Sequence, residues 1–251
     1  MPIPNEAHIR SLLEGLAHDL RGSFGASASL SQMLKESYVD KLDERALTWL
    51  DMISTEYAIS KRKLLAISSL ACLYDYQVQT SPCSLSEIVS NALIESKCVL
   101  TSEASDNIQL IDDIQCATHN LSTILTSNEL ITQYINELFL NSAIHAIPAQ
   151  PALNNANNTS VILKSEFRYL DNENSHLLVY TDNGHLLTTK DIKYIQTPFN
   201  TLKSSRTKAQ SVGLGLSKLA RIAELLSATL IFDIGTNQYT GLQVSLEIPK
   251  V

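Results

Sequence analysis

The sequence predicts an α+β protein: an antiparallel helical hairpin that forms a dimeric four-helix bundle, followed by an α/β two-layer sandwich. Two observations predict the hairpin. Apolar residues recur every three or four positions over 9–34 and again over 46–71, and the segment 36–43 that joins them is short and polar. A third observation predicts the sandwich, because helical and strand patterns interleave in the rest of the chain.

The two apolar stripes of the hairpin require a partner. Leu16 and Leu20 lie in the stripe of the first helix, and Asp43 is a suitable N-cap for the second helix. Two helices alone cannot bury both stripes, whereas a second copy of the hairpin would complete a four-helix bundle. We therefore expect a homodimer formed through residues 6–75.

A linker separates the hairpin from the second domain. The segment 77–84 contains Thr80-Ser81-Pro82, a helix-breaking run. We therefore expect three parts: the hairpin 1–76, the linker 77–84 and the second domain 85–251. In the second domain, periodicity and turn residues predict the following elements in order: helix 85–100, strand 107–114, helix 128–147, strands 160–170 and 175–182 around the turn "DNEN", a glycine loop, helix and strand over 212–232, and strand 240–249.

The composition excludes several classes of protein. The formal net charge is −7 and no run of Lys or Arg occurs, so we expect neither nucleic acid nor an anionic membrane surface as a main partner. No apolar run approaches the ~20 residues of a membrane helix, and the N-terminus lacks the parts of a signal peptide. We therefore expect a cytoplasmic protein without membrane insertion. The four cysteines are not in CxxC or CxxH spacing, which disfavours a zinc site.

A histidine and an aspartate are adjacent in the first helix, in "LAHDLRGSFG". His18 is about 200° around the helix from Leu16, so we expect its side chain to face solvent. Asp19 can hydrogen-bond one ring nitrogen and leave the other free. A neutral imidazole nitrogen is a nucleophile toward a phosphoryl group, and a carboxylate can accept its proton. Taken alone, such a pair is more often an ordinary exposed histidine beside an aspartate.

Two further polar pairs occur in the second domain. Glu137 and Asn141 are one turn apart on the predicted helix, where an Asn oxygen can bind Mg²⁺ and a Glu can polarise a nucleophile. Asp182 and Gly184 follow a strand, where a carboxylate can accept a hydrogen bond from a purine amine and the glycine permits a sharp turn. The simpler alternatives are a polar helix edge and a plain turn.

The fourth candidate is the glycine loop of "SVGLGLSKLARI". Gly213 and Gly215 precede a helix, so backbone N–H groups there can point at phosphates. The long polar segment before this loop carries several cations, including Lys203 and Arg206. Long connections of this kind often form lids over a site.

The order of these motifs resembles the catalytic core of a two-component sensor histidine kinase, over almost the whole chain. "LAHDLRGSFGASASLSQML" is similar to the phosphoacceptor box of that family, and "NELFLNSAIHA" to its asparagine box. "DNG" and "GLGLSKLARI" resemble its glycine boxes, and "TPFNT" its phenylalanine box. The Glu-x-x-x-Asn spacing resembles the wider ATPase superfamily that includes gyrase, Hsp90 and MutL, whose two-layer sandwich the resemblance implies here.

The resemblance also implies roles for the candidate residues. His18 would be phosphorylated from ATP with Asp19 as acid or base, and Glu137 would take the position of a water-activating base. The cofactors would be ATP and Mg²⁺, with Asn141 on the metal and Asp182 on the adenine amine. Gly213 and Gly215 would bind the phosphates, and Gly184 and the lid residues Lys203 and Arg206 would complete the nucleotide site. The implied partners are a second copy, the receiver domain of a response regulator and a separate sensor protein.

Four positions depart from the pattern of that family. Ser23 replaces the usual proline of the acceptor box, and Gly22 replaces the Thr or Asn associated with phosphatase activity. Leu186 replaces a glycine of the first glycine box, and Ile144 replaces a lysine after the asparagine. The last two changes leave an alternative open, in which the protein relays phosphoryl groups through histidine without ATP and its nucleotide domain is degenerate.

Overall fold

The computed structural model forms two compact units, Met1–Tyr76 and Gln77–Val251. It describes residues 6–102, 111–146, 161–184, 187–202, 212–236 and 239–250. None of the described helices is both long and apolar enough to cross a membrane.

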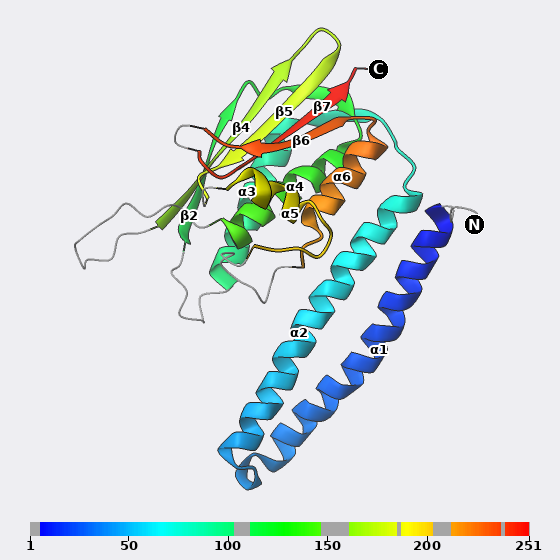
Figure 1. Cartoon of the computed structure of the whole chain (residues 1–251), viewed down its shortest axis with the longest axis vertical. Helices are drawn as coiled ribbons and strands as arrows, with labels where there is room; N and C mark the ends of the chain where they lie inside the picture. Colours follow the sequence, from blue (N-terminus) through cyan, green and yellow to red (C-terminus); the bar gives the residue numbers. More distant parts are fainter. Residues whose placement is uncertain are drawn as a thin grey trace, which may run out of the picture. The chain divides into compact units, whose positions relative to one another are not determined.

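The first unit is an antiparallel helical hairpin, as the two apolar stripes predicted (Figure 1). Helix α1 (Glu6–Tyr38) is followed by the 3₁₀ turn η1 (Val39–Lys41), helix α2 (Glu44–Cys72) and the 3₁₀ turn η2 (Leu73–Asp75). The expected N-cap is confirmed, because the Asp43 carboxylate accepts a hydrogen bond of 2.7 Å from the Ala46 backbone N–H.

Small side chains contribute to the contact between the two helices of the hairpin. Ala17 is 1% exposed and Ser31 is buried, and Arg21 Nη2 donates to Ser68 Oγ of α2 across 3.4 Å. Leu16 and Leu20, by contrast, remain 52% and 42% exposed in a single chain. The leucine stripe therefore lies beside the contact with α2 rather than in it, and a single hairpin leaves it uncovered.

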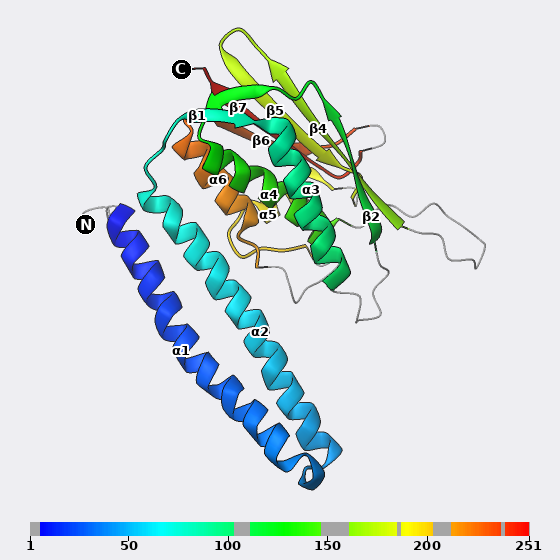
Figure 2. The same ribbon diagram turned by 180° about the vertical axis from the view of Figure 1, so that it is seen from behind.

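The second unit is a five-stranded sheet with helices on one face (Figure 1 and Figure 2). The strand order is β2-β4-β5-β7-β6, in which β2 and β4 are parallel and all other neighbours are antiparallel. The strands of this sheet are β2 (Ile111–His119), β4 (Val161–Asp171), β5 (Ser175–Asp182), β6 (Thr229–Ile234) and β7 (Leu242–Pro249). The helices are α3 (Leu85–Ser102), α4 (Asn128–His145), α5 (Thr189–Ile195) and α6 (Gly215–Leu225).

Burial alternates along β4, as expected for a sheet that is covered on one face. In β4, Leu163 and Phe167 are fully buried, whereas Lys164 is exposed. Leu163 belongs to a buried cluster with Ala143 of α4, which joins the helical layer to the sheet. This two-layer arrangement fixes α4 against the sheet that contains β5, which ends at Asp182.

Part of the expected linker belongs to the second unit. Residues Ser81–Ser84 form strand β1, which pairs in antiparallel register with β3 (Thr123–Thr126). Pro82 is tolerated because β1 has a strand on one side only, among the described residues, so the missing N–H costs no ladder bond there. Residues 81–84 of the expected linker thus form a paired strand of the second unit.

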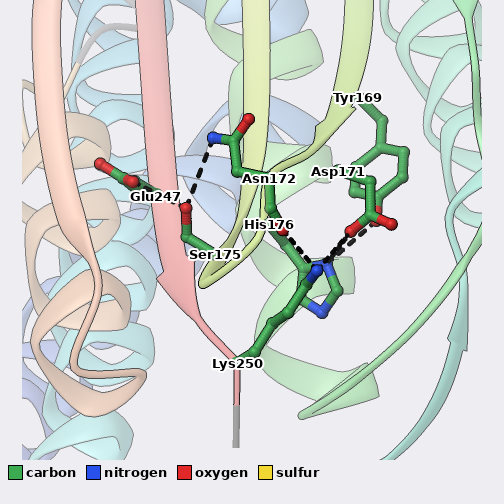
Figure 3. Close-up of polar contacts among 7 residues, drawn as sticks. All are labelled: Tyr169, Asp171, Asn172, Ser175, His176, Glu247 and Lys250. Carbon is green, nitrogen blue, oxygen red and sulfur yellow. Dashed lines mark hydrogen bonds and ion pairs between the residues drawn. The ribbon is translucent and has the colours of Figure 1, made fainter.

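A polar network joins the β4–β5 turn to the end of β7 (Figure 3). Lys250 Nζ lies 2.9 Å from an Asp171 oxygen and also donates to the Asn172 carbonyl. Ser175 Oγ donates to Glu247 Oε1 across 2.7 Å. These bonds tie the β4–β5 turn to the end of β7, the strand that lies between β5 and β6 in the sheet.

Candidate functional site

Helix α4 carries two of the predicted residues. Its first turn is capped by Ser127, whose side chain accepts a hydrogen bond from the Leu130 backbone N–H. Leu138 and Phe139 are buried, whereas Glu137 and Asn141 lie one turn apart at the partly exposed edge of the helix. Core packing therefore fixes the direction in which these two polar side chains point.

Asp182 ends strand β5 inside a buried hydrogen-bond network. Its Oδ2 accepts a bond of 2.6 Å from Ser142 Oγ, and its Oδ1 accepts one of 2.9 Å from the Gly184 backbone N–H. The Tyr180 hydroxyl donates in turn to Ser142 Oγ across 2.9 Å. Burial raises the pKa of Asp182 above its ordinary value, while the bonds from Ser142 and the backbone oppose that rise. The network orients the carboxylate in a low-dielectric environment.

Glycine is required on both sides of this carboxylate. A Cβ on Gly184 would lie 2.8 Å from Asp182 Oδ1 and 2.9 Å from the Ala146 Cβ. A Cβ on Gly241, just before β7, would come within 1.8 Å of the same oxygen. Gly241 was not among the predicted site residues, although its backbone N–H also donates to the Asp182 carbonyl across 2.9 Å. Backbone therefore encloses Asp182 closely.

The glycine loop before α6 is folded against the segment around Phe199. Gly213 has a φ of +70°, and a Cβ there would lie 2.6 Å from the Phe199 carbonyl carbon. The Phe199 N–H donates to the Gly213 carbonyl across 2.7 Å. Phe199 itself has a φ of 66°, which is rare for an aromatic residue, and its side chain is exposed. The predicted phenylalanine and glycine boxes are thus in direct contact.

The start of α6 lies directly against the polar edge of α4. A Cβ on Gly215 would lie 2.5 Å from Glu137 Oε1 and 2.8 Å from both amide atoms of Asn141. Only a glycine permits this approach, because any larger residue would separate the two helices. Since Ser142 follows Asn141 and holds Asp182, the structure brings three of the predicted motifs together.

Glu137 faces a cation from α6. Lys218 Nζ lies 3.6 Å from Glu137 Oε2, and the two side chains are 19% and 16% exposed. Burial raises the pKa of Glu137, and the attraction of Lys218 opposes that rise. Lys218 was not predicted as a site residue, although it stands three positions after Gly215 in the sequence.

The residues of α4 and α6 fit the cofactors that the sequence suggested. Asn141 Nδ2 is buried without a hydrogen-bond partner among the described residues. A 180° turn of the amide exchanges its nitrogen and oxygen, so this position can offer an oxygen to Mg²⁺. The first N–H groups of α6 have no side-chain cap within the described part of the chain, which leaves them available to phosphate oxygens.

His18 and Asp19 lie in the other unit, on α1. His18 Nδ1 and Asp19 Oδ1 are 3.3 Å apart, and the two side chains are 86% and 84% exposed. The imidazole therefore faces solvent, as the helical position predicted. With Nδ1–H donating to Asp19, the lone pair of Nε2 remains free for attack.

Some of the predicted positions lie outside the described residues. These are Lys203, Arg206 and Leu186. Of the segment predicted as a lid, the described part includes α5, which a Thr188–Asp191 capping box begins. Ile144, at the position where the resembled family has a lysine, is partly buried in α4.

Comparison with known proteins gives similarity of fold. No protein-family model and no curated protein sequence matches the chain. The Acinetobacter baumannii histidine kinase AdeS matches with a TM-score of 0.55 at 15% identity, over 92% of this chain and 97% of AdeS. Full-length ShkA in complex with AMPPNP matches with a TM-score of 0.60 at 13% identity, over 95% of this chain and 45% of ShkA. The chain therefore has the fold of a histidine kinase catalytic core, a helical hairpin followed by a mixed α/β sandwich.

Proposed function

We propose that the protein is an ATP-dependent protein-histidine kinase, which phosphorylates His18 and passes the phosphoryl group to an aspartate of a response regulator. One observation carries this proposal: Asn141 and Gly215 are in contact, and Ser142 ties Asp182 to the same end of α4. A metal ligand, a phosphate-binding helix start and a purine-binding carboxylate are thus next to one another. A structural core gains nothing from the unpaired amide of Asn141.

Each residue of the nucleotide site has one task. Asn141 binds Mg²⁺, and the backbone N–H groups that begin at Gly215 bind phosphate oxygens. Asp182, held by Ser142 and Gly184, accepts a hydrogen bond from the adenine amine. ATP supplies the γ-phosphoryl group, and the residues around it act by positioning and by charge neutralisation.

His18 is the acceptor in this proposal. Its Nε2 lone pair forms a bond to the γ-phosphorus, while the bond from that phosphorus to the bridging oxygen of ADP breaks. Asp19 Oδ1, 3.3 Å from Nδ1, accepts the Nδ1 proton as the bond forms, which leaves a neutral phosphoimidazole. In the second step a receiver aspartate attacks the same phosphorus and the bond from phosphorus to Nε2 breaks, while Asp19 returns the proton to Nδ1 so that the imidazole leaves as a neutral ring.

The hairpin supplies the dimer of this proposal. Leu16 and Leu20 on α1, and Trp49 and Met52 on α2, are large apolar side chains that a single chain leaves exposed. A second hairpin would bury them in a four-helix bundle, which leaves the solvent-facing His18 accessible. The receiver domain and a separate sensor protein are the other proposed partners.

A second candidate is a phosphotransfer protein that uses no ATP. The ion pair of Glu137 and Lys218 favours it, because these two charges neutralise each other without a ligand. In that case phosphorylated receiver domain would transfer its phosphoryl group to His18 when ATP is absent.

Nucleotide binding separates the two candidates. The melting temperature of the purified protein is measured with and without millimolar Mg-ATP, for the wild type and for Asn141→Ala. The kinase proposal predicts a rise for the wild type and a much smaller rise for the variant. Ser90→Ala, on an exposed helix edge, is the control and should behave as the wild type. If the wild type shows no rise, the kinase proposal is wrong.

A further inference from the structure

Lys218 adds a cation to a helix end that already favours anions. It lies in the first turn of α6, where the helix dipole is positive, and that turn contains no acidic residue. Its ammonium is directed at Glu137, which belongs to a different helix. The position therefore concentrates positive charge at the end of α6 that lies against Asn141.

The ion pair with Glu137 leaves N–H donors of the Lys218 ammonium available for a ligand. The distance from Lys218 Nζ to Glu137 Oε2 is 3.6 Å, which is longer than a hydrogen bond. A lysine ammonium has three N–H donors, so an anion that approaches the start of α6 can be bound without loss of the contact with Glu137. Glu137 holds the ammonium near Asn141 because both side chains of α4 lie against Gly215.

The neighbouring position that could supply such a cation from α4 is apolar. Ile144 follows Asn141 by three residues and is partly buried. Without Lys218, the α4 side chains next to Gly215 would present a carboxylate, Glu137, to the phosphates and no compensating charge. A carboxylate and a phosphate repel each other strongly when they are neighbours in a partly buried site.

From this geometry we propose that Lys218 binds the phosphates of the nucleotide directly, as the cation that α4 lacks. This inference rests on the proposed nucleotide site and adds to it a residue from α6. The ligand it recognises is a nucleoside di- or triphosphate rather than a nucleoside, because Lys218 and the α6 N–H groups contribute only to the phosphate part of binding.

The test compares ATP with adenosine. Dissociation constants of both are measured with Mg²⁺ by nuclear magnetic resonance titration for the wild type, Lys218→Met and Lys218→Arg. We expect Lys218→Met to weaken ATP binding by about ten- to hundred-fold, the range for a hydrogen bond to a charged group, and to change adenosine binding less than about twofold. Lys218→Arg should restore most of the ATP affinity.

Two further variants separate direct binding from other roles of Lys218. Arg221→Met removes another ion-paired cation from α6, beside Glu224, and should leave ATP binding unchanged. In Glu137→Gln/Lys218→Met the unpaired carboxylate is also removed, and ATP binding should stay weak. If ATP affinity returns to the wild-type value in this double variant, Lys218 only neutralises Glu137 and the inference is wrong.

The remaining outcomes are equally decisive. Equal losses for ATP and adenosine, or a loss in Arg221→Met as large as in Lys218→Met, would show that Lys218 merely supports the fold. Unchanged ATP affinity in Lys218→Met would also overturn the inference while leaving the proposed kinase function intact. If the wild type binds adenosine but not ATP, or binds neither, the nucleotide site itself fails and the inference fails with it.

Discussion

Ser142 is the residue whose removal tests the described geometry most sharply. Its hydroxyl donates to the Asp182 carboxylate across 2.6 Å and accepts from the Tyr180 hydroxyl across 2.9 Å. All three side chains are buried, so Ser142→Ala leaves two polar groups without this partner. A hydrogen bond to a charged group contributes about 1.5–3 kcal/mol and a neutral one about 0.5–1.5 kcal/mol. We therefore expect the free energy of unfolding to fall by about 2–4 kcal/mol.

The effect of Ser142→Ala should also depend on pH. Burial already raises the pKa of Asp182 in the folded state above its value in the unfolded state. The folded state therefore binds this proton more tightly, and stability falls as pH rises from the unfolded pKa to the folded pKa. The bond from Ser142 opposes the rise, so its removal raises the folded pKa further. The destabilisation by Ser142→Ala should therefore be larger at about pH 7 than at about pH 4.

Urea unfolding followed by circular dichroism measures both effects. Ser90→Ala is the matched control, because its hydroxyl donates only to the Ser86 carbonyl of its own helix in the described contacts, and we expect a change within about 0.5 kcal/mol. Tyr180→Phe combined with Ser142→Ala should cost less than the sum of the two single changes, since the pair is in direct contact. A loss below about 0.5 kcal/mol for Ser142→Ala, independent of pH, would refute the described network.

Three other predictions concern His145 at the end of α4, the glycine beside Asp182 and the dimer. Burial lowers the pKa of His145 from 6.5 to about 4, so the unfolded state binds this proton at higher pH and the free energy of unfolding should fall as pH decreases through this window. His145→Gln should reduce the loss of unfolding free energy between pH 7 and pH 5 by about 2 kcal/mol in urea unfolding. An unchanged loss would contradict the burial of this side chain. Gly241→Ala places a Cβ 1.8 Å from Asp182 Oδ1 and should destabilise the protein by about 2–3 kcal/mol, whereas wild-type stability would contradict the close approach. Light scattering should give twice the chain mass of 27.7 kDa for the wild type and one chain mass after Leu16→Glu and Leu20→Glu, and a monomeric wild type would exclude the bundle.

The elements with long periodic patterns were predictable from the sequence. Helices α2 and α4 begin within a residue of their predicted starts, because Asp43 and Ser127 cap them as local rules require. Strands β1 and β3 were missed, since each has four residues and β1 contains Pro82, which reads as a break. Short strands depend on a partner far along the chain, and local patterns do not contain that information.

The site was predictable in part for the same reason. Asp182 and Asn141 belong to local motifs, whereas Ser142 gains its role only through a carboxylate 40 residues away. Lys218 likewise reads as an ordinary helix lysine until α6 and α4 are in contact. The leucine stripe of α1 shows the limit of periodicity, which identified an apolar face but not whether α2 or another copy covers it.

The central claim is that His18 receives a phosphoryl group from ATP, and radiolabelling tests it most directly. The purified protein is incubated with γ-labelled Mg-ATP as wild type, His18→Ala and His119→Ala, the last being an exposed histidine of β2 that serves as control. We expect label on the wild type and on His119→Ala, lost in acid and kept in alkali as a nitrogen–phosphorus bond requires, and no label on His18→Ala. Label on His18→Ala equal to that of the wild type would contradict this claim.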